Sequence, residues 1–188
     1  VCLPVAAPAQ VIDIGEATRL GEGRLAVAVE SSDAKLAQLA RRACALHGGF
    51  QLAAAAQSSY VFNFEPSGSA SVVLSIRSGE PAQELLRRSV AGRDWQHALL
   101  RACDMAVEAT LHSKGFFAGK LAFIGKQGGV SEVYTSDLLF NQVRPLTADR
   151  ALVTGLSWSP DGNKLLYTTY YKSGFPDIYM LNLSSARK

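Results

Sequence analysis

The sequence predicts an α+β domain, a mixed sheet with two helices on one face, followed by an all-β part of repeated short strands. Three observations support this fold class. Apolar residues recur at intervals of three and four after Asp33 and again after Asp94, as in amphipathic helices. Between residues 60 and 77 the apolar period changes to two, which indicates strands. After residue 119 the helical spacing disappears and short apolar segments follow one another.

The first 23 residues form two segments that precede the predicted domain. Residues 1–9 are apolar, uncharged and end in Ala7-Pro8-Ala9, which indicates the remnant of a secretory signal peptide cut after Ala9. The alternative, a Pro/Ala-rich arm of the mature protein, stays open. Residues 10–23 contain the short apolar run Val11-Ile12-Asp13-Ile14-Gly15 and are expected to form an N-terminal arm.

Residues 24–118 are expected to form the α/β domain, in the order β-α-β-β-β-α. A strand over 24–29 precedes a helix that Asp33 caps and that ends at His47-Gly48-Gly49. Strands follow at 60–64, 69–77 and 84–90. Asp94 is expected to cap a second helix from Trp95 to about His112. Because each helix has one apolar stripe, both are expected to pack on the same face of the sheet.

Three cysteines, Cys2, Cys44 and Cys103, allow two interpretations. If residues 1–9 are removed on export, Cys44 and Cys103 remain as an even pair in an oxidising compartment and could form one disulfide. The alternative is two buried thiols on helices that act as small hydrophobic side chains. The sequence does not decide between them.

The last part, residues 119–188, contains an internal repeat. Lys120-Leu121-Ala122-Phe123-Ile124 aligns with residues 164–168 at an offset of 44, and residues 132–138 align with 177–183 at an offset of 45. Repeats of about 40–45 residues built from short strands are typical of β-propeller blades. Residues 119–188 therefore predict about one and a half blades of a propeller.

The composition narrows the function classes. Of 188 residues, 48% are hydrophobic and 19% are charged, which excludes a disordered chain. The net charge of +3 lies in the last third of the chain and is too small to favour nucleic-acid binding. No apolar run approaches the ~18 residues of a membrane span. We also expect no metal, no cofactor and no enzymatic activity, because no metal-ligand spacing, nucleophile elbow or phosphate loop is present.

One motif makes the propeller resemblance specific. The run Trp158-Ser159-Pro160-Asp161-Gly162, followed by a lysine and an apolar strand, resembles the blade motif of the TolB family, and residues 144–147 match the end of a preceding blade there. The order of parts also resembles TolB, in which an exported α/β domain joins the propeller through a Gly-rich junction. Residues 10–15 resemble the start of mature TolB.

The resemblance implies a periplasmic component of the Tol-Pal cell-envelope system that supports outer-membrane integrity. Such a protein binds TolA-like and Pal-like partners and is peripheral to the membrane through these partners only. By the resemblance, the TolA-like partner is expected to bind the arm, at Val11, Ile12, Asp13, Ile14 and Gly15. Tyr170, Tyr171 and Phe175 are further interface candidates, because tyrosine is enriched at binding hot spots.

About one and a half blades do not close a ring, which departs from the TolB pattern. The apolar strand 177–183 would then be an exposed edge, able to pair with another chain. Two alternative functions follow. The chain could be the N-terminal part of an exported propeller-linked hydrolase or ligand-binding protein. It could instead be a short TolB relative that self-associates through the exposed blade edge.

Overall fold

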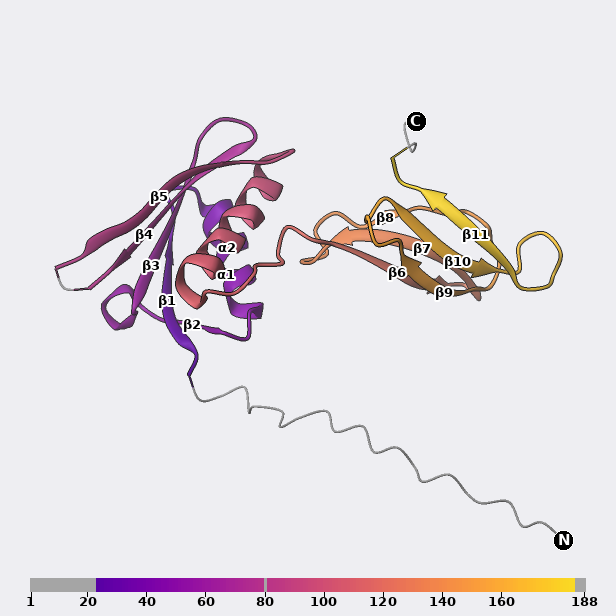
Figure 1. Ribbon diagram of the computed structural model, residues 1–188, viewed down its shortest axis with the longest axis horizontal. Helices are drawn as coiled ribbons and strands as arrows, with labels where there is room; N and C mark the ends of the chain where they lie inside the picture. The colour runs from indigo at the N-terminus through magenta and orange to yellow at the C-terminus, as the bar shows by residue number, and fades with distance from the viewer. Residues whose placement is uncertain (1–22, 80, 185–188) are drawn as a thin grey trace, which may run out of the picture.

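The computed structural model describes residues 23–79 and 81–184, which form an α/β unit and a pair of small β-sheets (Figure 1). The predicted segments 1–9 and 10–22 lie outside the described residues. The elements of the α/β unit are β1 (Leu25–Glu30), α1 (Ala34–Leu46), β2 (Phe50–Leu52), a 3-10 turn (Ala55–Gln57), β3 (Tyr60–Pro66), β4 (Ser71–Ser78), β5 (Gln83–Ala91) and α2 (Trp95–Leu111). The sheet pair consists of β6 (Lys120–Gln127), β7 (Val130–Asp137), β8 (Arg144–Pro145), β9 (Val153–Trp158), β10 (Lys164–Thr169) and β11 (Asp177–Asn182).

The α/β unit is a five-stranded mixed sheet in the order β2-β1-β3-β4-β5, with α1 and α2 on one face (Figure 1). Strand β1 pairs parallel with β2 and β3, and the other neighbours are antiparallel. Alternate side chains of the strands, such as Phe62, Phe64 and Leu74, are completely buried. The mixed sheet and the two helices on one face were predicted correctly.

Strand β2 was not predicted. It has three residues, which is too short for an alternating pattern to be visible in the sequence. Pairing with a strand distant in the sequence positions β2 in the sheet, because Phe50 lies opposite Leu25 of β1. The expectation of four strands in this sheet was therefore wrong by one edge strand.

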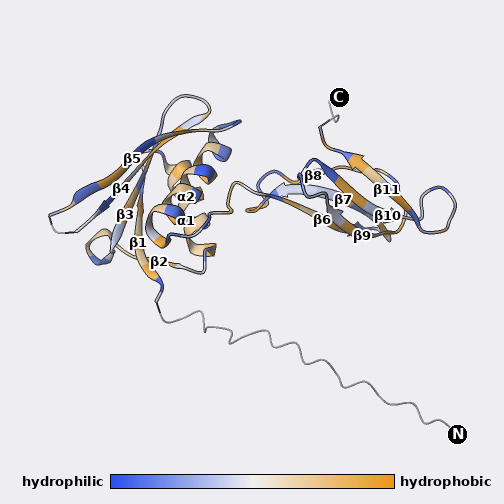
Figure 2. Ribbon diagram, viewed as in Figure 1, coloured by the Kyte–Doolittle hydropathy of each residue, from blue (hydrophilic) through white to orange (hydrophobic). Residues whose placement is uncertain are grey.

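Both helices begin at the predicted caps. The Asp33 carboxylate accepts hydrogen bonds from the backbone N–H groups of Lys35 and Leu36, at 2.8 and 3.0 Å. The Asp94 carboxylate accepts one from the N–H of His97 at 2.8 Å. Such caps satisfy donors that have no partner within the helix. Hydrophobic and hydrophilic residues alternate along each helix, as Figure 2 shows, and the buried face of each packs into the core of the unit.

The sheet pair consists of two three-stranded antiparallel sheets, β6-β7-β8 and β11-β10-β9. The internal repeat occupies equivalent strands, β6 with β7 in one sheet and β10 with β11 in the other. Phe123 lies opposite Tyr134, and at the equivalent positions Tyr167 lies opposite Tyr179. The ring centroids of the two pairs are 5.6 and 5.8 Å apart. The repeat in the sequence is therefore a repeat in the structure.

The predicted Asp-Gly turn connects β9 and β10. Gly162 has φ +68°, a conformation that L side chains rarely adopt, and the Lys164 N–H donates to the Ser159 hydroxyl at 2.9 Å. The Asp161 carboxylate accepts hydrogen bonds from the Ser159 hydroxyl and from the Asn163 backbone and side chain. These bonds favour the charged carboxylate and lower the pKa of Asp161 to about 2.

Titration of Asp161 tests this turn. Because the pKa of Asp161 is lower in the folded than in the unfolded chain, the turn is stabilised above about pH 4, and this contribution is lost as the pH falls towards about 2. The pH dependence of the Asp161 carboxyl carbon shift, measured by NMR, should give a midpoint near 2. In a Ser159→Ala variant the midpoint should move upward. A midpoint near 4 in the wild-type protein would contradict the hydrogen bonding described here.

Candidate interaction surfaces

The predicted interface residues lie in different parts of the molecule. Val11, Ile12, Asp13, Ile14 and Gly15 fall outside the described residues. The three predicted aromatic residues lie in the loop between β10 and β11. Tyr171 and Phe175 are 52% and 73% exposed, whereas Tyr170 is half-buried and its N–H donates to the Leu152 carbonyl at 3.1 Å.

The β10–β11 loop presents Phe175 on an ordered turn. The Ser173 hydroxyl donates to the Asp177 carboxylate at 2.8 Å, and the Phe175 N–H donates to the Ser173 oxygen at 3.1 Å. Gly174 between them has φ +73°. An exposed aromatic ring on a preorganised backbone can enter an interface at little entropic cost. The loop is therefore a suitable anchor for a protein partner.

Beside this loop, one face of the β9–β11 sheet exposes large apolar side chains. Leu166 lies opposite Met180 in the register of β10 and β11, and Thr168 lies opposite Ile178. The exposed fractions of Leu166, Ile178 and Met180 are 44%, 76% and 58%. We call this set, Leu166, Ile178 and Met180, the open face. An exposed edge was predicted for this strand, and an exposed face was not, although the continuous apolar run 178–181 indicates that both faces of β11 are apolar.

A cleft of about 430 Å³ lies between the α/β unit and the sheet pair. Arg93, Lys120 and Arg144 bring positive charge to it, and the Asp94 and Asp137 side chains bring negative charge. Burial, followed by the charges of Arg93 and Arg101, lowers the pKa of His97 in this cleft. The Gln142 side chain bridges the two parts by donating to the Gln96 oxygen at 2.6 Å. The mixed charges do not select one class of ligand.

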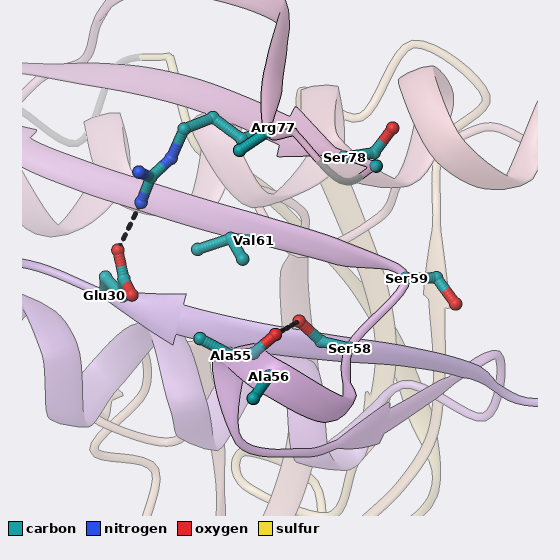
Figure 3. Close-up of a pocket in the computed structure, with 10 residues that line it drawn as sticks. Glu30, Ala55, Ala56, Ser58, Ser59, Val61, Arg77 and Ser78 are labelled. Atoms are coloured by element: carbon teal, nitrogen blue, oxygen red, sulfur yellow. Dashed lines mark hydrogen bonds and ion pairs between the residues drawn. The ribbon is translucent and has the colours of Figure 1, made fainter.

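A groove of about 480 Å³ lies on the sheet face opposite the helices (Figure 3). Arg77 and Glu30 form an ion pair at 2.5 Å across Val61, and both side chains are more than 40% exposed. The rest of the lining consists of small residues around the 3-10 turn, and the Ser58 hydroxyl donates to the Ala55 carbonyl at 2.9 Å. Among the described lining residues there is no histidine or cysteine to activate a nucleophile.

The two cysteines of the helices are free, buried thiols in this structure. Cys44 of α1 and Cys103 of α2 belong to one core cluster and are each 1% exposed. Contact with Cys44, together with burial, raises the pKa of the Cys103 thiol. The structure thus brings the pair together without a bond between them, and a disulfide between Cys44 and Cys103 stays a prediction.

The described part of the chain contains neither a cluster of metal ligands nor a helix that could cross a membrane. No group of three His, Cys, Asp or Glu side chains within residues 23–79 and 81–184 could hold a metal ion. None of the helices in these ranges is long and apolar enough to cross a membrane.

Sequence comparison finds relatives that are named TolB. No protein-family model matches the chain. A protein named TolB homolog from Chlorobaculum tepidum is 36% identical over 124 residues, which cover 60% of this chain and 28% of that protein. The Tol-Pal system protein TolB of Desulfosudis oleivorans is 30% identical over 94 residues, 50% of this chain and 21% of the relative. The Tol-Pal system protein TolB of Chromobacterium violaceum is 27% identical over 146 residues, 72% of this chain.

The fold is shared with a solved structure. The crystal structure of TolB from Acinetobacter baumannii superposes with a TM-score of 0.75 and 18% identity, over 87% of this chain and 48% of that one. The chain spans about a fifth to a third of the length of the three relatives above. The chain is thus similar in sequence to parts of curated TolB proteins, and it shares the fold of a solved TolB structure.

Proposed function

We propose that the chain is a non-enzymatic interaction component of the Tol-Pal system, exported to the periplasm, where it supports outer-membrane integrity by binding TolA-like and Pal-like proteins. The names of its relatives support this proposal. The observation that carries it is the ordered β10–β11 loop, which presents Tyr171 and Phe175 to solvent beside an apolar sheet face. Exposed aromatic anchors of this kind fit protein recognition.

In this proposal the two parts of the chain have separate roles. Residues 24–118 are the N-terminal domain, and residues 119–188 supply about one and a half propeller blades. Within the arm, Val11, Ile12, Asp13, Ile14 and Gly15 bind the TolA-like partner by main-chain pairing, which makes little demand on side-chain identity. Tyr171 and Phe175 contact a second protein partner, with Tyr170 supporting the loop from its half-buried position.

Isothermal titration calorimetry with the purified TolA and Pal proteins of the same genome tests both roles. Deleting residues 10–15 should abolish TolA binding and leave the far-UV circular dichroism spectrum unchanged. The double variant Tyr171→Ser, Phe175→Ser should weaken the binding of one of the two proteins about tenfold or more, because two exposed aromatic anchors are removed. Leu85→Ser, which changes an exposed leucine of β5, is the matched control and should bind both partners normally. Binding of neither protein by the wild-type chain would reject the proposed function.

A further inference from the structure

The contact between α1 and α2 contains the cysteine pair. Both helices lie on the same face of the sheet and contact each other (Figure 1). The thiols of Cys44 and Cys103 contact each other within this core. Their buried neighbours on the two helices include completely buried alanines, which are Ala40 and Ala43 of α1 and Ala102 and Ala106 of α2. Small side chains let two helices approach closely, and a disulfide needs Cα atoms within about 7 Å of each other.

The same two helices hold the sheet pair on the α/β unit. Arg42 of α1 donates to the Asn141 oxygen in the loop after β7, at 3.2 Å. On α2, the Asp104 carboxylate accepts the N–H groups of Phe117 and Ala118, at 2.6 and 3.0 Å, in the segment that leads to β6. The attachments are therefore divided between the helices, and a shift of α1 against α2 would disturb one set or the other.

We propose that a disulfide-bearing oxidant joins Cys44 to Cys103, and that the bond clamps α1 to α2 and thereby fixes the sheet pair on the α/β unit. Cys44 lies two residues after Arg42, and Cys103 immediately precedes Asp104, so the bond connects the helices beside both attachments. The clamp rests on the export included in the proposed function, because disulfides persist in oxidising compartments. It requires neither a TolA-like nor a Pal-like partner.

The bond forms by thiol–disulfide exchange with a protein or small-molecule disulfide. One cysteine loses its proton and attacks a sulfur of the oxidant, which gives a mixed disulfide and releases the other oxidant sulfur as a thiolate. The second cysteine, also deprotonated, attacks the protein sulfur of the mixed disulfide and releases the remaining oxidant thiolate. The released thiolates take up the two protons. The cysteine pair thus loses two electrons and two protons, and the oxidant gains them.

Burial determines when this exchange takes place. In the folded chain both cysteines are 1% exposed, which keeps an oxidant away from the sulfur atoms. The contact with Cys44, followed by burial, raises the pKa of the Cys103 thiol and disfavours the reactive thiolate. The bond therefore forms during folding, while α1 and α2 are still apart. Once the core has closed, the same burial protects the bond from reductants.

Refolding in a glutathione buffer tests the formation and timing of the bond. The 188-residue chain carries Cys2→Ser in every sample, so that only the two helix cysteines remain. After refolding from urea with oxidised glutathione, the intact mass should fall by that of two hydrogen atoms, without a glutathione adduct. The folded, reduced chain should react about a hundredfold more slowly or less, because the helices must first separate. A refolded chain that keeps two thiols, or equal rates from both starting states, would overturn the proposal.

A variant with one helix cysteine is the control for this chemistry. Cys103→Ala, in the same Cys2→Ser background, retains Cys44 but has no second helix thiol to resolve a mixed disulfide. After the same refolding it should keep either a free thiol or a glutathione adduct. Loss of two hydrogen atoms in this variant would overturn the assignment of the bond to Cys44 and Cys103.

Hydrogen exchange of the oxidised and the dithiothreitol-reduced chain tests the clamp itself. Exchange of the Phe117 and Ala118 amides, which bond to Asp104, should slow about tenfold or more on oxidation. The Lys164 amide, which bonds to Ser159 in the β9–β10 turn, is the control and should not change. A bond that leaves the exchange of Phe117 and Ala118 unchanged would overturn the clamp. These measurements need no TolA or Pal protein, so calorimetry detects a failure of the proposed function separately.

Discussion

Shortening Leu139 to alanine is expected to destabilise the α/β unit by about 2–5 kcal/mol, although residue 139 follows β7 in the sheet pair. The Leu139 side chain is 1% exposed and belongs to the core cluster formed by α1, α2 and the five-stranded sheet. Removing its methyl groups leaves a cavity in that core. Urea unfolding followed by near-UV circular dichroism measures the loss.

The loop that contains Leu139 explains why the cavity should remain. The Asp137 carboxylate accepts hydrogen bonds from the N–H groups of Leu139 and Asn141, at 2.8 and 3.1 Å. The Asn141 oxygen in turn accepts from Arg42 of α1 at 3.2 Å. Because the loop is fixed on both sides, it should not collapse into the space. Leu152→Ala, at a leucine that is 49% exposed, is the control and should cost less than about 0.5 kcal/mol. Equal urea midpoints for both variants would contradict this role of Leu139.

Replacing Asp104 by alanine should destabilise the protein by about 2–3 kcal/mol, because two backbone donors lose their acceptor. The Asp104 carboxylate of α2 accepts the N–H groups of Phe117 and Ala118 at 2.6 and 3.0 Å. These bonds hold the chain where it leaves α2 and place Phe117, 2% exposed, in the core. The backbone at Gly115 lies close against α2, because a Cβ on Gly115 would lie 2.4 Å from the Asp104 Cα.

The pH dependence of stability separates the charge of Asp104 from its hydrogen bonds. Burial raises the pKa of Asp104, and the two N–H donors oppose this rise only in part. The folded chain therefore binds the proton more tightly than the unfolded chain. The resulting stabilisation is complete below the unfolded pKa near 4 and is lost as the pH rises through the higher folded pKa. Asp104→Asn keeps one acceptor oxygen and cannot titrate.

Urea unfolding between pH 3 and 7 compares the three proteins. The Ala variant should be the least stable at every pH. The advantage of the wild type over the Asn variant should decrease as the pH rises. A difference between these two that stays constant with pH would show that Asp104 has the same pKa in both states.

Local patterns predicted most of the elements. Both helices, the β3–β4 hairpin and the repeated strand pairs lie where the sequence placed them, within a few residues. Such elements depend on interactions over a few residues: the spacing of apolar side chains, the caps Asp33 and Asp94, and the turn at Gly162. Strand β2 was missed because three residues contain too little pattern, and its pairing partner, β1, lies 25 residues away in the register.

The features of the candidate interaction surfaces also divide into those that the sequence determined and those that only the tertiary structure decided. The sequence by itself determined the repeat, the TolB resemblance and the aromatic loop with Tyr171 and Phe175. Only the tertiary structure decided that Leu139 enters the core of the α/β unit, that Cys44 contacts Cys103, and that Ile178 remains in water. The physical reason is that periodicity shows which side chains share a face, whereas burial depends on what the rest of the chain places over that face.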